Sequence, residues 1–246
     1  MRHIDLNCDM GEGFGNDAAL MPYISSANIA CGYHAGDDGT MNETVLLAVR
    51  HGVSIGAHVS FPDKEHFGRS EMTLSPTAIY SLVQTQLHGL KKIVAKYDVG
   101  ISHVKPHGAL YNMSARDAAL AHVIAKAVAD LDPALVLMGL SGSHSVNAAK
   151  ALKLKTAAEA FADRRYEEDG SLRPRSLPGA MLESTGEAVR QVLQMVNSGT
   201  VTAITGRQVP VSVDTICIHG DGEHAVAFAA QINQTLKHHS IEIKAF

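Results

Sequence analysis

The stretch "HVKPHGALYN" (residues 103–112) joins the end of a hydrophobic strand to the start of a helix. The run "VGISHV" that leads into Lys105 predicts a buried extended segment. Pro106 and Gly108, which are typical of turns and of the ends of helices and strands, flank His107. An unpaired ammonium is costly to bury. Lys105 therefore indicates either a buried salt bridge to a carboxylate or one edge of a polar site.

The same order of an apolar run, a polar or glycine-rich turn and a helix recurs along the chain. The helix after residue 74 has a clear start, because Ser75 suits the N-cap and Pro76 the first helical position. Residues 200–213 predict a small extended excursion around Gly206. The main extended segments are predicted at residues 3–9, 26–31, 53–60, 101–106, 134–141, 155–162 and 214–221.

Strands that alternate with helices predict a parallel sheet with helices outside it. About seven such units, with no linker between them, predict a single α/β domain over residues 1–246 that closes into a (β/α) barrel slightly short of eight units. An open doubly wound sheet is the alternative. Its dinucleotide-binding form is disfavoured, because "GEGFGND" matches G-x-G-x-x-G only loosely and places Glu12 where a pyrophosphate would approach.

Composition narrows the class of protein. The formal charge of -4 disfavours a nucleic-acid or anionic-membrane surface, and the hydrophobic content of 46% is enough for a core. We expect neither a membrane span nor a secretory segment, since the first apolar run contains Asp5. The three cysteines, Cys8, Cys31 and Cys217, form no C-x-x-C pair and predict reduced thiols in a cytoplasmic protein.

Polar residues gather where the predicted strands end, which is where barrel enzymes build their active sites. Residues two apart on a strand share a face, so members of each group point the same way. We expect these side chains to surround a common cavity. The groups are Asp5, Asn7 and Asp9; His34 and Asp37; His58; Lys105 and His107; Glu159 and Asp163; and His219 and Asp221.

A divalent metal bound at these strand ends stays open from the sequence. Oxygen and nitrogen ligands are available, but no pair has a diagnostic spacing such as H-x-x-x-H. The candidate ligands are Asp5, Asp9, His34, His58 and His219.

Seven motifs together carry a resemblance to a known family. They are "IDLNCDMGEGFG", "SANIACGYHAGD", "GAHVSFPD", "FGR", "HVKPHGALYN", "EAFADRRYEEDGSLRPRS" and "HGDGEHA". In this order, over essentially the whole chain, they resemble the LamB/YcsF family, from which the sequence departs at Val59, where proline is expected, and at Cys8, where a small residue is usual.

The resemblance implies a distorted, TIM-like seven-stranded (β/α) barrel similar to the glycoside hydrolase/deacetylase superfamily. It also implies an ATP-dependent hydrolase of a cyclic amide: with partner subunits B and C, such a protein opens 5-oxoproline (pyroglutamate) to glutamate at the expense of ATP.

This chemistry predicts a division of labour, because the chain has no G-x-x-x-x-G-K-[ST] loop. ATP is expected to act through the partner subunits, which phosphorylate the lactam oxygen, while this chain performs the hydrolytic opening. The catalytic set is Asp9 or His58 as base, Lys105 with Arg69 or Arg175 at the phosphate and oxyanion, and His107 or Asp221 as the acid for the ring nitrogen. The predicted substrate-binding residues are Asp5, Asn7, Glu12, His34, Asp37, Arg69, Tyr111, Glu159, Asp163, Arg164, Arg175 and His219.

Two other functions stay open from the sequence. A stand-alone metal-dependent polysaccharide deacetylase or amidohydrolase would use the same strand ends. A non-catalytic scaffold or sugar-binding subunit would leave the cluster around Lys105 without a role.

Overall fold

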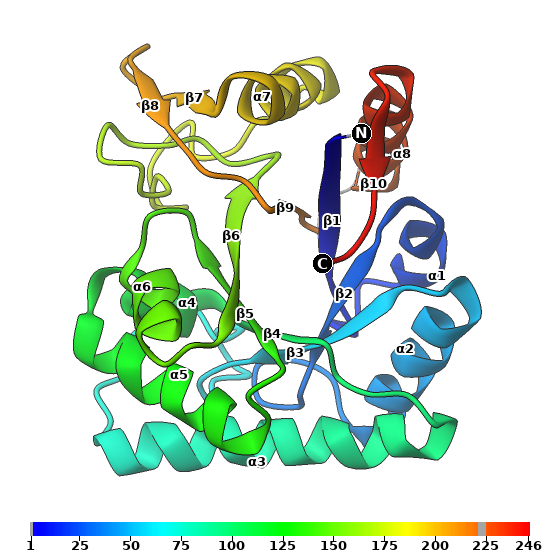
Figure 1. Ribbon diagram of the computed structural model, residues 1–246, viewed down its shortest axis with the longest axis vertical. Coiled ribbons are helices and arrows are strands. Elements are labelled where there is room, and N and C mark those ends of the chain that lie inside the picture. Colours follow the sequence, from blue (N-terminus) through cyan, green and yellow to red (C-terminus); the bar gives the residue numbers. More distant parts are fainter. Residues whose placement is uncertain (1, 221–224) are drawn as a thin grey trace.

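The computed structural model describes residues 2–220 and 225–246. Its centre is a closed barrel of parallel strands, each paired with the next along the chain (Figure 1). The last barrel strand pairs with β6 on one side and with β1 on the other, which closes the ring. The barrel strands are β1 (Arg2–Met10), β2 (Ser26–Ala30), β3 (Ser54–Val59), β4 (His103–Pro106), β5 (Val136–Leu140), β6 (Lys155–Phe161) and β9 (Thr215–Ile218). The predicted seven-stranded barrel is confirmed, and the open doubly wound sheet is wrong.

Helices surround this barrel, with α3 along the lower edge of the view in Figure 1. Their ends follow the sequence signals: Ser75 accepts a hydrogen bond from the Ala78 N–H at the start of α3, and Gly52 ends α2 at a φ of 65°. The helices are α1 (Asp17–Leu20), α2 (Asp38–His51), α3 (Pro76–Val94), α4 (Gly108–Arg116), α5 (Ala118–Leu131), α6 (His144–Ala151), α7 (Thr185–Ser198) and α8 (Ala225–His238), with short 3₁₀ turns η1 (Met21–Tyr23) and η2 (Ala95–Tyr97).

Two short β-structures lie outside the seven barrel strands. The predicted excursion is an antiparallel hairpin of β7 (Thr200–Thr202) and β8 (Gln208–Pro210), which lies beside α7 in Figure 1. The sequence analysis missed β10 (Ile241–Ile243), a three-residue strand that pairs with the first residues of β1. The chain then ends near the barrel axis, where the Phe246 ring lies 5.8 Å from the ring of His103.

The interior of the barrel is polar, whereas the space between strands and helices is apolar. On β1, Leu6, Cys8 and Met10 belong to the hydrophobic core, and the alternate residues belong to a network of buried polar groups. Most (β/α) barrels instead fill their interior with Val, Ile and Leu. Buried polar groups are costly without hydrogen-bond partners, so this barrel is built around specific polar contacts.

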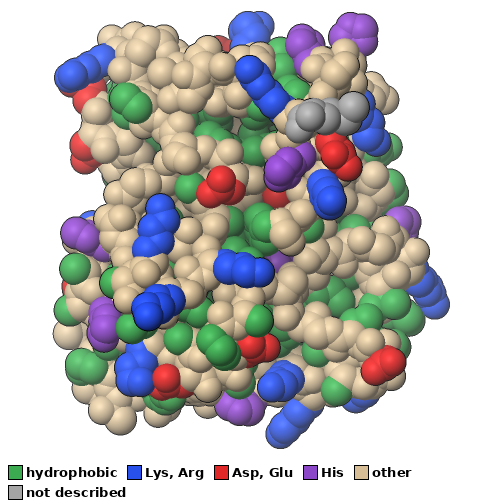
Figure 2. Space-filling view, in the orientation of Figure 1, with side chains coloured by type: hydrophobic (Ala, Val, Ile, Leu, Met, Phe, Trp, Pro, Cys, Tyr) green, Lys and Arg blue, Asp and Glu red, His purple; other side chains and the backbone are tan. Residues whose placement is uncertain are grey.

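The outer surface carries charges of both signs. On the face of the described residues drawn in Figure 2, basic and acidic side chains are interspersed. Among the helices of residues 2–220 and 225–246, none combines the length and apolar character that a membrane crossing requires.

Candidate active site

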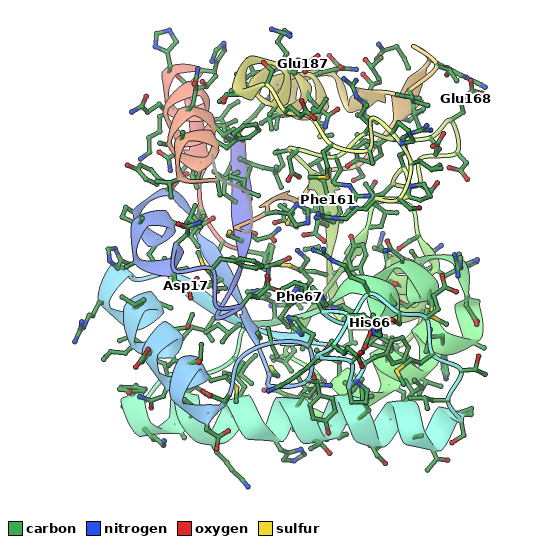
Figure 3. All side chains as sticks on the ribbon, turned by 180° about the vertical axis from the view of Figure 1, so that it is seen from behind. Asp17, His66, Phe67, Phe161, Glu168 and Glu187 are labelled. Carbon is green, nitrogen blue, oxygen red and sulfur yellow. The ribbon has the colours of Figure 1, made fainter. Side chains whose placement is uncertain are left out.

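A cavity of about 480 Å³ opens at the carboxyl ends of the strands. Its volume falls in the range of small-molecule sites. Phe67 and Phe161, which both line it, lie toward the middle of the molecule in Figure 3, whereas Glu168 and Glu187 lie at the upper edge of that view. The predicted residues that line the cavity are Asp9, Glu12, His58, Arg69, Lys105, His107, Tyr111, Arg164, Arg175 and His219.

Lys105 is the centre of a buried ionic cluster on the cavity floor. Its Nζ lies 2.9 Å from Asp9 Oδ1 and 2.9 Å from Glu159 Oε1. It also donates to Asn7 Oδ1 at 3.2 Å and contacts Cys217 Sγ at 3.1 Å. Lys105 therefore forms a buried salt bridge, and Asp9, one of the carboxylates that it holds, faces the cavity.

The charges in this cluster stabilise one another. Burial alone would lower the pKa of Lys105, but Asp9 and Glu159 outweigh burial and hold that pKa well above its ordinary value. Burial would also raise the pKa of Asp9, yet the neighbouring His58 and the Lys105 ammonium keep it well below the usual range. Asp9 is therefore ionised at neutral pH.

Asp5 and Asn7 lie below the cavity, inside the barrel. Asp5 accepts hydrogen bonds from the hydroxyls of Ser25 and Ser26, each at 2.7 Å, and from Thr215. Burial raises its pKa. Asn7 donates to Glu159 Oε1 at 3.0 Å, so both residues support the cluster from beneath. The cavity lining includes neither of them, contrary to the expectation that they contact substrate.

A second cluster joins Glu12 to three histidines beside the floor. His58 Nε2 lies 2.9 Å from His107 Nδ1 and 3.3 Å from Asp9 Oδ2. His34 Nε2 lies 2.9 Å from Glu12 Oε1, and the His34 ring stacks on His107 at 3.8 Å. Burial lowers the pKa of His34 and, with the charge of His58, lowers that of His107 to about 3. His34 itself is buried behind His107 and is not part of the cavity lining.

Two close approaches of the backbone hold this cluster. Gly68 has a φ of 65°, and a Cβ there would lie 2.9 Å from atoms of both His34 and His107. The neighbouring Phe67 carbonyl accepts a hydrogen bond from His107 Nε2 at 2.8 Å. Sequence reasoning missed Phe67 as a site residue, although the "FGR" motif placed a glycine beside it.

The opposite wall carries His219 and several arginines. His219 Nδ1 lies 2.8 Å from Asp163 Oδ2, and its ring stacks on Phe161 with centroids 5.6 Å apart. Burial lowers the pKa of Arg164, with a contribution from Arg175, to about 10. Arg164 and Arg175 line the cavity on this side, and Arg69 lines it on the other side, where its guanidinium carbon lies 5.0 Å from the centre of the Phe67 ring. The cavity is therefore suitable for an anionic ligand.

Three predicted site residues have other positions. Asp37 is exposed and caps α2, where its Oδ1 accepts the Thr40 N–H at 2.8 Å, so the structure does not bring it to the cavity. Glu159 and Asp163 are not part of the cavity lining, but they pair with Lys105 and with His219, which are. Asp221 lies outside the described residues.

Comparison with known proteins gives a consistent result. The chain matches the LamB/YcsF family over residues 4–246. It is 51% identical over 245 residues to the A subunit of 5-oxoprolinase from Staphylococcus carnosus, covering 98% of this chain and 97% of that protein. A lactam utilization protein from Thermus thermophilus superposes with a TM-score of 0.93 at 41% identity, covering 99% of this chain and 100% of the other.

More distant structures share the fold alone. A peptidoglycan deacetylase from Bacillus subtilis superposes with a TM-score of 0.50 at 11% identity, covering 99% of this chain and 87% of that one. This likeness confirms the predicted similarity to the deacetylase barrel.

Proposed function

The chain belongs to the LamB/YcsF family, and from that premise we propose that it is the A subunit of an ATP-dependent 5-oxoprolinase. Its reaction is the hydrolytic opening of 5-oxo-L-proline to L-glutamate. The full-length identity of 51% to a protein of that name supports the activity. The observation that carries the assignment to this cavity is the ion pair of Asp9 and Lys105, 2.9 Å apart on the floor of a pocket with an arginine-lined wall.

The floor of the cavity has the groups that water needs to attack a lactam carbon. His58 Nδ1–H donates to the Lys105 carbonyl oxygen at 2.9 Å, which leaves Nε2 directed at Asp9. We assign the proton from water to this Asp9–His58 pair. His107 Nδ1, 2.9 Å from His58 Nε2, is placed to share that proton, and the Asp9–His58 pair returns it to the ring nitrogen that leaves.

Lys105 acts in this scheme mainly on Asp9. An ammonium has three protons, and acceptors on Asp9, Glu159 and Asn7 lie within 3.2 Å of Nζ. A substrate oxygen would have to displace one of them. We therefore assign the predicted phosphate and oxyanion contacts chiefly to Arg69, Arg164 and Arg175, whose forked donors suit carboxylate and phosphate oxygens.

The stability of the amide bond explains why ATP and the partner subunits are needed. A lactam is a poor electrophile, and this chain lacks a P-loop. We propose that subunits B and C activate 5-oxoproline with ATP and that the activated lactam is opened here. An ATP-dependent reaction and three free cysteines suit a cytoplasmic complex.

Reconstitution tests this proposal. The purified chain is mixed with the two partner subunits, ATP and 5-oxoproline, and glutamate and phosphate are measured separately with each component omitted in turn. Asp9→Asn should reduce glutamate formation by about 10²–10⁴, the range for loss of a general base. The matched control is Asp98→Asn, an exposed residue in a left-handed turn that asparagine tolerates. Glutamate formation without this chain would contradict the proposal.

The deacetylase alternative is tested in the same assay. The likeness to deacetylases rests on 11% identity and concerns the fold. Release of acetate from acetylated sugars by the isolated chain would favour that alternative.

A further inference from the structure

The tautomers of two histidines create an unusual contact at the edge of the cavity. His58 Nδ1 faces the Lys105 carbonyl oxygen at 2.9 Å, and His107 Nε2 faces the Phe67 carbonyl oxygen at 2.8 Å. A carbonyl only accepts hydrogen bonds, so both of these nitrogens carry the proton. In neutral imidazoles the other two nitrogens, His58 Nε2 and His107 Nδ1, then hold lone pairs, yet they face each other at 2.9 Å.

Two facing lone pairs need a positive charge between them. The charge is either a shared proton or a bound cation. Metal-binding histidines characteristically donate their outer N–H to a backbone carbonyl or a carboxylate, which is the arrangement of both rings here.

Glu12 completes a triangle with these nitrogens. Its Oε1 lies 3.8 Å from His58 Nε2 and 3.6 Å from His107 Nδ1, and the two nitrogens are 2.9 Å apart. The nearest point equidistant from three atoms with these separations lies in their plane, about 2.0 Å from each of them. This distance is within the usual zinc–nitrogen and zinc–oxygen bond lengths of about 2.0–2.2 Å.

We propose that Glu12, His58 and His107 bind one divalent transition-metal ion, of the Zn²⁺ or Co²⁺ type, at the edge of the cavity. Imidazole nitrogens favour such ions over Mg²⁺, which prefers oxygen ligands. All three ligands line the cavity, so the remaining coordination position faces the substrate space. The ligand set differs from the one expected from sequence, of which it retains only His58.

His34 and Asp9 support the site without being ligands. The His34 ring is stacked on His107 with an interplanar angle of 9°, so its in-plane lone pair runs alongside that of His107 and does not meet it. His34 instead orients Glu12 from 2.9 Å, while Ser60 holds its other nitrogen. Asp9, 3.3 Å from His58 Nε2, is the neighbouring carboxylate able to accept a proton from metal-bound water.

This inference deepens the proposed function, because the ion would activate the water that opens the lactam. With an ion in place, His58 and His107 are both ligands, so Asp9 alone accepts the proton from water and returns it. Metal binding is measured on the isolated chain, whereas glutamate formation needs the partners, so either result can fail without the other.

The test is a metal titration of the chelator-stripped chain. Co²⁺ should bind with a stoichiometry of one and produce visible d–d absorption, and Zn²⁺ should displace it. X-ray absorption of the Zn²⁺-loaded wild-type protein should show two imidazole ligands, a result that does not depend on any variant folding.

Variants locate the ion. His107→Gln and Glu12→Gln should each weaken Co²⁺ binding by at least about tenfold, which is the lower end for perturbed metal sites. His66→Gln, which removes a histidine whose side chain is 61% exposed, is the matched control and should bind like wild type. Circular dichroism checks that each variant is folded.

Three outcomes would overturn the proposal: no stoichiometric uptake of Co²⁺ or Zn²⁺ by the wild-type chain, an absorption spectrum without histidine ligands, or a folded His107→Gln variant that binds as tightly as wild type. The first would assign the charge between the two rings to a shared proton.

Discussion

Replacing Lys105 with methionine tests the ionic cluster most directly. The substitution keeps most of the aliphatic volume but removes the only charge that compensates Asp9 and Glu159 within 3 Å among the described residues. Glu159 is fully buried and Asp9 is 8% exposed, so neither carboxylate gains full hydration in exchange. Breaking a buried pair in this way costs about 3–5 kcal/mol.

The remaining contacts place the expected loss at the lower end of that range. Asp9 keeps the hydrogen bond from Asn28 at 2.9 Å, and Glu159 keeps the one from Asn7 at 3.0 Å. A loss of about 3 kcal/mol corresponds to a fall in melting temperature of about 6–12 °C, since 1 kcal/mol shifts a domain of this size by about 2–4 °C. Calorimetry or thermal circular dichroism measures this fall.

Two companion variants make the assay specific. Lys126→Met removes a lysine whose side chain is 54% exposed and which pairs with Asp130 on the surface, so its melting temperature should stay close to that of wild type. Lys105→Met combined with Glu159→Gln removes one of the two uncompensated charges and should melt above Lys105→Met alone. A Lys105→Met protein that melts within about 2 °C of wild type would refute the reasoning, because the buried carboxylates would then not depend on the ammonium.

Three further predictions concern other parts of the barrel. Burial opposes ionisation of Asp163, but His219 lowers the pKa of this carboxyl overall. The ionised Asp163 therefore stabilises the fold at neutral pH, and this stabilisation is lost as the pH falls below the unfolded pKa of about 3.9. Asp163→Asn should lower the free energy of unfolding at about pH 7, measured by urea titration, and should make that free energy depend less on pH in the acid range. Gly56→Ala should lower stability by about 1–3 kcal/mol, because its Cβ would lie 2.0 Å from His103 Nε2, whereas Gly89→Ala, with open space around it, should not; equal melting temperatures would contradict this. The isolated chain should show no appreciable ATPase activity in a phosphate-release assay, and steady-state hydrolysis abolished by Lys105→Ala would return nucleotide chemistry to this chain.

The order of strands and helices could be read from the sequence because it depends on local patterns. Apolar runs of five to eight residues alternate with amphipathic segments, and caps such as Ser75 mark the helix starts. The missed strand β10 shows the limit of this reasoning. It is three residues long, and its pairing with β1 joins the two ends of the chain, which no local pattern predicts.

The residue types of the site could also be predicted, since polar side chains at the ends of barrel strands are unusual unless they serve a site. How far each of these side chains lies from the cavity could not be predicted from the sequence. Asp5, Asn7 and Asp9 share one face of β1, yet only Asp9 reaches the cavity, because each step of two residues moves a side chain by about 7 Å along the strand. Asp37 did carry a local signal, an aspartate directly before a helix, which is typical of an N-cap.

The pairing of functional groups was decided by tertiary structure alone. Glu12, His34, His58 and His107 come from four separate segments, and barrel closure brings them within contact distance of one another. The tautomers of His58 and His107 depend on the carbonyl groups of Lys105 and Phe67, which lie 47 and 40 residues away in the sequence. The sequence by itself determined a parallel barrel with polar residues at the carboxyl ends of its strands. The alternation of strands with helices and the residue types at strand ends are both local properties of the sequence. Which nitrogen faces which oxygen follows only from the packing of distant loops, because a lone pair is directed by the hydrogen bond on the far side of its ring.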